Sequence, residues 1–124
     1  SLHDALPIFC EEMEPILPTS QSIALFRITQ EALTNVVKHA HASKVIIRVD
    51  SREDSVILSI KDDGLGFSRS ISVEKEYLHW GINIMRERAR AVGGDLRINN
   101  SLSSGTEVIV CIPRSFDGNH NFAG

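Results

Sequence analysis

The sequence lacks the long apolar run that a membrane-spanning helix needs. No hydrophobic stretch approaches the roughly 20 residues required, although 42% of the 124 residues are hydrophobic. A basic block is also missing, since 13 Lys and Arg against 16 Asp and Glu give a net charge of -3. Nothing therefore supplies the electrostatic footprint of a nucleic-acid-binding protein. The composition predicts a soluble domain for which DNA and RNA are not partners.

Cysteine is equally scarce. Cys10 and Cys111 lie far apart without metal-type spacing, and Cys111 falls in an apolar, strand-like run where a thiol is expected to act as a small hydrophobe. This usage fits a reducing, cytoplasmic setting. No basic start followed by an apolar stretch marks a secretory signal, and a chain that opens without Met is expected to lack its true beginning.

Two stretches carry a helical period. The first begins at Thr19 or Ser20, either of which could cap a helix, and its apolar residues recur at three- and four-residue steps as far as residue 40. This pattern predicts an amphipathic helix. A second helix is expected over residues 81–92, where Gly93-Gly94 supplies a stop signal.

Four stretches rich in Val and Ile carry strand signals. Polar turns separate the members of each pair and predict two hairpins. The stretches are residues 44–50, 55–62, 95–99 and 106–113. Before the second helix, polar residues as far as Tyr77 show no period, which predicts a mobile loop that could act as a lid.

The order helix, hairpin, loop, helix, hairpin does not alternate single strands with single helices. It predicts an α+β fold, a two-layer α/β sandwich with helices on one face of a mixed, largely antiparallel sheet. The folded domain is expected at residues 19–113. Residues 1–18, which include three prolines, are expected to form an extended or truncated leading segment, and residues 114–124 a flexible tail.

Two polar residues of the first helix, Glu31 and Asn35, lie four positions apart at the border of its apolar stripe. A carboxylate and an amide at this spacing could together hold a hydrated Mg²⁺, which prefers oxygen ligands and takes few protein groups. Lys38 shares that side of the helix. The alternative is a solvated helix face with an ordinary polar pair.

Asp62 ends a predicted strand on its apolar side, because the two-residue period aligns it with the apolar residues before it. A carboxylate aimed at a core is costly unless it is paired, and the exocyclic amine of adenine is a suitable donor. Gly64 and Gly66 would let a flat base or a phosphate approach the backbone closely. The alternative is a tight turn in which Asp63 and Gly64 only satisfy turn geometry. A P-loop or Rossmann site is disfavoured, because no Gly-Lys-Ser/Thr follows and no βαβ unit surrounds the glycines.

Gly81 is expected to open the second helix after His79 and Trp80. The amides and dipole at a helix N-terminus favour an anion such as phosphate, and a glycine there keeps the backbone accessible. The alternative is a glycine that eases a loop into a helix.

Together these segments resemble the sequence boxes of the histidine kinase ATPase domain, in the superfamily that includes the ATPase domains of gyrase, the Hsp90 chaperones and the MutL repair proteins. Residues 26–40 look like the N box, residues 62–67 like the first glycine box, and Gly105-Thr106 like the closing Gly-Thr. Residues 79–89 look like the second glycine box of the branch similar to the nitrate sensors. Only one glycine stands in that box, where other branches carry more. The resemblance implies a Bergerat-type ATPase fold.

The resemblance also implies roles for individual residues. Asn35 would ligate Mg²⁺, and Glu31 would polarise a metal-bound water or a phosphate. Asp62 would bind the adenine amine, with Thr106 beside it. The remaining implied contacts are Gly64 and Gly66 with the adenine, and Gly81, Lys38 and His39 with the phosphates.

The implied function is that of the ATP-binding catalytic domain of a two-component sensor histidine kinase. It would transfer the γ-phosphoryl group of ATP, with Mg²⁺, to a histidine on the separate dimerisation domain of the parent kinase. A response regulator with a LuxR-type DNA-binding domain is the implied indirect partner. The domain would be cytoplasmic, and a parent kinase anchored in the inner membrane is left open.

Two alternatives remain within the same superfamily, an anti-sigma-type serine kinase and a catalytically silent nucleotide-binding interaction module. The second glycine box argues against the serine kinase. The joint presence of Glu31, Asn35 and Asp62 argues against the silent module, because each could be lost without harming a core.

Overall fold

The chain is described here from a computed structural model, which describes residues 8–10, 17–65, 72–100 and 105–114. Two α-helices, one π-helix and five strands are present in these ranges. In chain order they are β1 (Ile8–Cys10), α1 (Thr19–Asn35), the π-helix η2 (Val36–Ala40), β2 (Val45–Ser51), β3 (Ser55–Asp62), α2 (Ser72–Arg90), β4 (Asp95–Asn99) and β5 (Glu107–Pro113). None of the helices in these ranges is long and apolar enough to cross a membrane.

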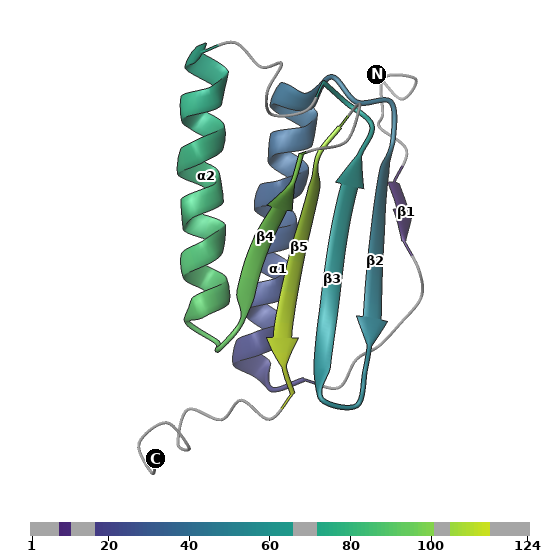
Figure 1. Cartoon of the computed structure of the whole chain (residues 1–124), viewed down its shortest axis with the longest axis vertical. Helices are drawn as coiled ribbons and strands as arrows, with labels where there is room; N and C mark the ends of the chain where they lie inside the picture. The colour runs from purple at the N-terminus through teal and green to yellow at the C-terminus, as the bar shows by residue number, and fades with distance from the viewer. Residues whose placement is uncertain (1–7, 11–16, 66–71, 101–104, 115–124) are drawn as a thin grey trace.

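The strands form one sheet in the order β1-β2-β3-β5-β4. β1 runs parallel to β2, and every other neighbouring pair is antiparallel. Both α-helices lie on one side of this sheet (Figure 1). The expected α+β sandwich, with helices on one face of a mixed, largely antiparallel sheet, is confirmed.

Alternation along the central strands decides which residues face the helices. In β3 and β5 the even-numbered residues are buried and their odd-numbered neighbours are more exposed. The buried positions pack against α1 and α2 to form one core. Its best-buried members include Ile28 of α1, Met85 of α2, Ile60 of β3 and Val110 of β5. Asp62 continues the even positions of β3 and is therefore turned toward the helices.

The second helix begins at Ser72, and the expected start near Gly81 is wrong. A glycine inside a helix costs about 1 kcal/mol relative to alanine, which does not end a helix that packing supports. Leu78, which is buried, extends the apolar stripe of Ile82 and Met85 by one turn toward the N-terminus. The expected lid loop is thus helical from Ser72 onward, and residues 66–71 of it lie outside the described residues.

The ends of the first helix also differ from expectation. Pro18 occupies the N-cap position, and neither Thr19 nor Ser20 caps the helix with its side chain. At the other end the α-helix stops at Asn35, and the chain continues as the π-helix to Ala40. The strands agree closely with expectation, since β3 and β4 have the predicted bounds.

The two cysteines lie on different strands. Cys10 belongs to β1, which pairs with Val45–Ile47 of β2 although no strand was expected in this leading segment. Cys111 is exposed, and the expectation that it acts as a small hydrophobe is wrong. Its odd position in β5 places it on the face of the sheet away from the helices.

A buried glutamine holds one end of the molecule together. The Nε2 group of Gln21, at the start of α1, donates to the carbonyl oxygens of Val92, 3.2 Å away, and Pro113, 3.0 Å away. Gln21 is fully buried, so these bonds tie α1, the turn after α2 and the end of β5 together across the core. This end lies opposite Asp62, because Pro113 pairs with Ser55 at the other end of β3.

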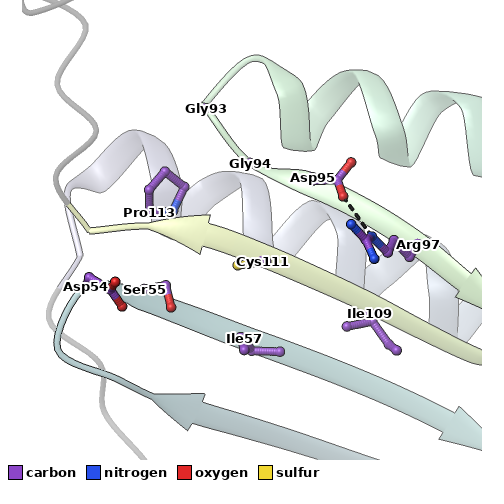
Figure 2. Close-up of a pocket in the computed structure, with 10 residues that line it drawn as sticks. All are labelled: Asp54, Ser55, Ile57, Gly93, Gly94, Asp95, Arg97, Ile109, Cys111 and Pro113. Carbon is purple, nitrogen blue, oxygen red and sulfur yellow. Dashed lines mark hydrogen bonds and ion pairs between the residues drawn. The ribbon is translucent and has the colours of Figure 1, made fainter.

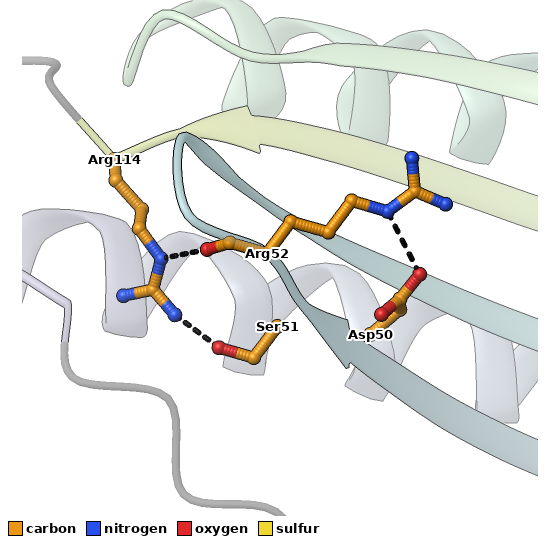
Figure 3. A network of polar contacts seen from close by, with 4 residues as sticks. All are labelled: Asp50, Ser51, Arg52 and Arg114. Atoms are coloured by element: carbon orange, nitrogen blue, oxygen red, sulfur yellow. Dashed lines mark hydrogen bonds and ion pairs between the residues drawn. The ribbon is translucent and has the colours of Figure 1, made fainter.

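Arg114 adds a surface clamp at the same end (Figure 3). Its backbone N–H donates to the carbonyl of Asp54 at 2.9 Å, and its Nε donates to the carbonyl of Arg52 at 2.6 Å. The guanidinium also donates to the hydroxyl of Ser51, while Arg52 itself pairs with Asp50 at 2.9 Å. Arg114, the residue after β5, is thereby fixed to the β2–β3 turn, and the candidate site lies at the opposite end of the sheet.

Candidate functional site

Asp62 is a buried carboxylate at the end of β3, with only 6% of its surface exposed. Its backbone N–H donates to the carbonyl of Thr106 at 3.0 Å, which extends the pairing of β3 with β5. The N–H of Gly64 donates to its Oδ1 at 2.8 Å. A carboxylate accepts at about four lone-pair positions, so this group has capacity for a further donor.

Burial raises the pKa of the Asp62 carboxyl above its ordinary value of 3.8. Desolvation is the largest cause, because it disfavours the charged form. Hydrogen bonds from the backbone of Gly64 and Thr106 act in the opposite direction, and the charge of Asp63 adds to the rise. A partly desolvated acceptor of this kind gains most from a ligand that donates a hydrogen bond to it.

Gly105 brings the segment that leads into β5 close to the backbone of Asp62. Its φ of +85° lies in the left-handed region, and a Cβ atom there would overlap the carbonyl oxygen of Asp62. Only glycine fits this approach. Thr106, which is half-buried, therefore lies directly beside the end of β3.

Glu31 and Asn35 meet Gly81 where α1 and α2 pack together. A Cβ atom at Gly81 would lie 2.7 Å from Glu31 Oε1, 3.4 Å from Asn35 Nδ2 and 3.6 Å from Asn35 Oδ1. Glu31 and Asn35 are half-buried and Gly81 is buried. The absence of a side chain at Gly81 thus leaves room for both polar groups between the two helices.

This contact changes the interpretation of Gly81. The residue lies inside α2 and not at its N-terminus, so the expected anion site on free helix amides is wrong. Its neighbours are instead the polar groups of the N box, residues 26–40. Sequence spacing could not show this, because residues 31 and 81 are brought together only by the packing of α1 on α2.

Three further predicted residues, Lys38, His39 and Gly64, fall within the described part of the chain. Lys38 and His39 belong to the π-helix that continues α1, and Lys38 is exposed. Gly64 is buried beside Asp62, whereas Gly66 lies outside the described residues.

Asp63 has a set of partners that the sequence did not reveal. Its Oδ1 accepts from the backbone N–H of Ser43 at 2.7 Å and of Lys44 at 3.0 Å, and its Oδ2 accepts from the Ser43 hydroxyl. These bonds lower the pKa of the Asp63 carboxyl, with the Ser43 hydroxyl as the largest cause. The sequence predicted only a turn-forming role for Asp63, because its hydrogen-bond partners lie some 20 positions earlier in the chain.

A separate groove of about 710 Å³ lies on the other face of the sheet (Figure 2). Its floor includes Ile57, Ile109 and Cys111, at odd positions that face away from the helices. None of the predicted site residues lines it. This groove therefore lies apart from the clustered polar groups.

Comparison with known proteins shows the family to which the chain belongs. The family model of the "Histidine kinase-, DNA gyrase B-, and HSP90-like ATPase" matches residues 20–115, most of the chain. The chain belongs to this ATPase family. Within the family, it is 38% identical over 95 residues to the nitrate/nitrite sensor protein NarX of Escherichia coli K12. It is 36% identical over 93 residues to the signal transduction histidine-protein kinase/phosphatase DegS of Bacillus subtilis.

These family members are much longer than the aligned part. The NarX alignment covers 77% of this chain and 15% of NarX, and the DegS alignment covers 75% and 24%. Solved structures of histidine kinases share the fold at lower identity. A histidine kinase domain from Erythrobacter litoralis matches with a TM-score of 0.72 at 22% identity, over 90% of this chain and 56% of that one. Acinetobacter baumannii AdeS matches with a TM-score of 0.67 at 17% identity, over 89% and 54%.

Proposed function

We propose that the chain is the ATP-binding catalytic domain of a sensor histidine kinase, which transfers the γ-phosphoryl group of ATP to a histidine outside this chain. The observation that carries the proposal is the contact of Gly81 with Glu31 and Asn35. It joins two sequence boxes that lie some 50 residues apart at one end of the sandwich. Sequence identity to NarX and DegS supports the same activity.

The adenine would be held at the end of β3. Asp62 would accept a hydrogen bond from the exocyclic amine, which gives the buried carboxylate the donor that its burial makes favourable. Gly64, whose N–H already orients the carboxylate, would let the flat base approach the backbone, and Gly66 would extend that surface. Thr106 would line the other side.

The phosphates and their metal would be held between the two helices. Asn35 would supply an amide oxygen to Mg²⁺, whose remaining ligands are waters and phosphate oxygens. Bound Mg²⁺ would neutralise charge on the transferring group, as in other phosphoryl transfers. Glu31 would orient a water or phosphate oxygen beside it, Gly81 would admit the phosphates, and Lys38 and His39 would contact them from the π-helix.

The partners follow from this reaction. The acceptor histidine would belong to the dimerisation and phosphoacceptor domain of the parent kinase, which would pass the group to a response regulator, in this branch one with a LuxR-type DNA-binding domain. We place the ATPase domain in the cytoplasm. A parent kinase anchored in the inner membrane is compatible with the sensor proteins to which the chain is similar.

The test is phosphoryl transfer to a supplied acceptor. The chain is mixed with the separate dimerisation domain of its parent, radiolabelled ATP and Mg²⁺, and the product is tested for acid lability. Acid-labile phosphohistidine supports the proposal. Acid-stable phosphoserine on a protein partner would instead identify an anti-sigma-type serine kinase, and ATP binding without transfer would identify a silent interaction module.

A further inference from the structure

The segment that follows the first helix is hydrogen-bonded to the end of β3 through the side chain of Asp63. Both carboxylate oxygens of Asp63 are used there, Oδ1 by two backbone N–H groups and Oδ2 by the hydroxyl of Ser43. All three donors belong to Ser43 and Lys44, which directly precede β2. Charge-assisted bonds of this kind are about twice as strong as neutral ones.

The Asp63 bonds lie just beyond the last paired residues of β2 and β3. The last pair between β2 and β3 is Val45 with Asp62, so the pairing of these two strands does not reach Ser43 and Lys44. The chain there has just left the π-helix through His41, whose φ of +52° is left-handed and uncommon for a residue other than glycine. Such a conformation persists where surrounding contacts fix it, and the Asp63 bonds lie two residues away.

The alternative of a turn-forming aspartate does not account for these bonds. In the turn after β3, the N–H of Gly64 bonds to the carboxylate of Asp62. The side chain of Asp63 reaches instead to a segment 19 and 20 residues earlier. It therefore connects the segment that follows the helix of Glu31 and Asn35 to the strand that carries Asp62.

We propose that Asp63 is a positioning residue that keeps the metal-binding half of the site, Asn35 and Glu31, in register with the adenine-binding half, Asp62. This inference rests on the proposed function, because the two halves matter together only when one ATP spans them. The lowered pKa of Asp63 keeps its carboxylate ionised at neutral pH, as the three donors require.

The experiment measures the affinity for ATP with Mg²⁺ and with EDTA by calorimetry, in the native chain and in Asp63→Ala, Asp63→Asn and Ser43→Ala. Loss of an orienting partner of a metal site costs about 10- to 100-fold in affinity. Asp63→Ala is expected to lower the Mg²⁺-dependent gain in affinity about tenfold, while binding in EDTA stays within about twofold. Asp63→Asn should restore most of the gain, since its Oδ1 can still accept both N–H groups and its NH₂ can donate to Ser43.

Ser43→Ala keeps the two backbone bonds and should lie between the native chain and Asp63→Ala. Asp54→Ala is the matched control, since Asp54 is an exposed aspartate at the far end of the same hairpin. Amide hydrogen exchange at Ser43 and Lys44 should quicken in Asp63→Ala and stay unchanged in Asp54→Ala. If Asp63→Ala does not fold, the Ser43→Ala comparison carries the test.

Two results would overturn the inference. One is that Mg²⁺ raises the ATP affinity of Asp63→Ala as much as it raises that of the native chain. If only Ser43→Ala folds, the same result in Ser43→Ala would count. The other is an equal loss of affinity with Mg²⁺ and with EDTA, which would show that Asp63 acts only through its neighbour Asp62. A native chain that binds no ATP would contradict the proposed function itself, which is a different outcome from either.

Discussion

Two adjacent aspartates at the end of β3 have opposite environments. Asp62 is buried and faces the helices, whereas Asp63 is at the surface and accepts three hydrogen bonds from the two residues before β2. Burial raises the pKa of Asp62, and the donors lower the pKa of Asp63. The environment of Asp62 thus favours the protonated form or a hydrogen-bond-donating ligand, and that of Asp63 favours the ionised carboxylate.

These directions predict opposite effects of pH on stability. The folded-state pKa of Asp62 is raised, so its contribution is fully present below 3.8 and is lost as pH rises through the folded value. The folded-state pKa of Asp63 is lowered, so its contribution is present above 3.8 and is lost as pH falls through the folded value. Urea unfolding of the native chain, Asp62→Asn and Asp63→Asn between about pH 3 and pH 7 measures both.

Asp62→Asn should gain stability relative to the native chain as pH rises, because it keeps no buried charge. Asp63→Asn should be less stable than the native chain near neutral pH, and the difference should shrink as the pH falls. Differences that move in the same direction for both variants would contradict the two assigned environments.

At the scale of elements, the site depends on how closely α2 approaches α1. Gly81 lies in the middle of α2, where a glycine costs about 1 kcal/mol relative to alanine. The cost is offset locally by the room it leaves for Glu31 and Asn35. The helix therefore carries a residue that suits the site better than it suits the helix.

Gly81→Ala should separate stability from function. The added methyl group would meet the flexible end of Glu31, which can move aside, so the free energy of unfolding should be unchanged or rise by up to about 1 kcal/mol. Displacement of the Glu31 carboxylate should lower phosphoryl transfer at least about tenfold. Asn83→Ala, at an exposed position of the same helix, is the control and should keep full transfer. Full transfer by Gly81→Ala would show that the contact has no role.

The sequence predicted individual elements well where one period governs them. The two-residue period gave the bounds of β3 and the inward direction of Asp62, because burial of alternate residues is a local pattern. It did not predict the first nine residues of α2, since Gly81 read as a boundary while the packing that tolerates it is tertiary. The role of Asp63 was missed for the same reason.

At the scale of the whole molecule, the two ends of the sandwich are built differently. Buried Gln21 and the surface clamp of Arg114 fix the end where β3 begins. The opposite end carries Asp62, the approach of Gly105 and the contact of Gly81 with the N box. This separation predicts that stability and ligand binding respond to different substitutions.

Gln21→Ala should destabilise the fold without weakening ATP binding. It removes two hydrogen bonds and leaves the carbonyls of buried Val92 and half-buried Pro113 with fewer donors, at a cost of about 1–3 kcal/mol. Thermal unfolding should shift downward by several degrees, and the ATP affinity of the folded protein should stay within about twofold. Gln30→Ala, an exposed glutamine of the same helix, should leave both unchanged. A tenfold loss of ATP affinity in Gln21→Ala would contradict the separation of the two ends.

Calorimetric ATP binding, with and without Mg²⁺, by the native chain, Asp62→Asn and Asn35→Asp tests the central claim most directly. The native chain should bind saturably. Asp62→Asn should weaken binding about tenfold or more with or without metal, and Asn35→Asp should weaken it mainly when Mg²⁺ is present. No ATP binding by a folded native chain, or equal affinities for all three proteins, would contradict the assignment of an ATP site to this end of the sandwich.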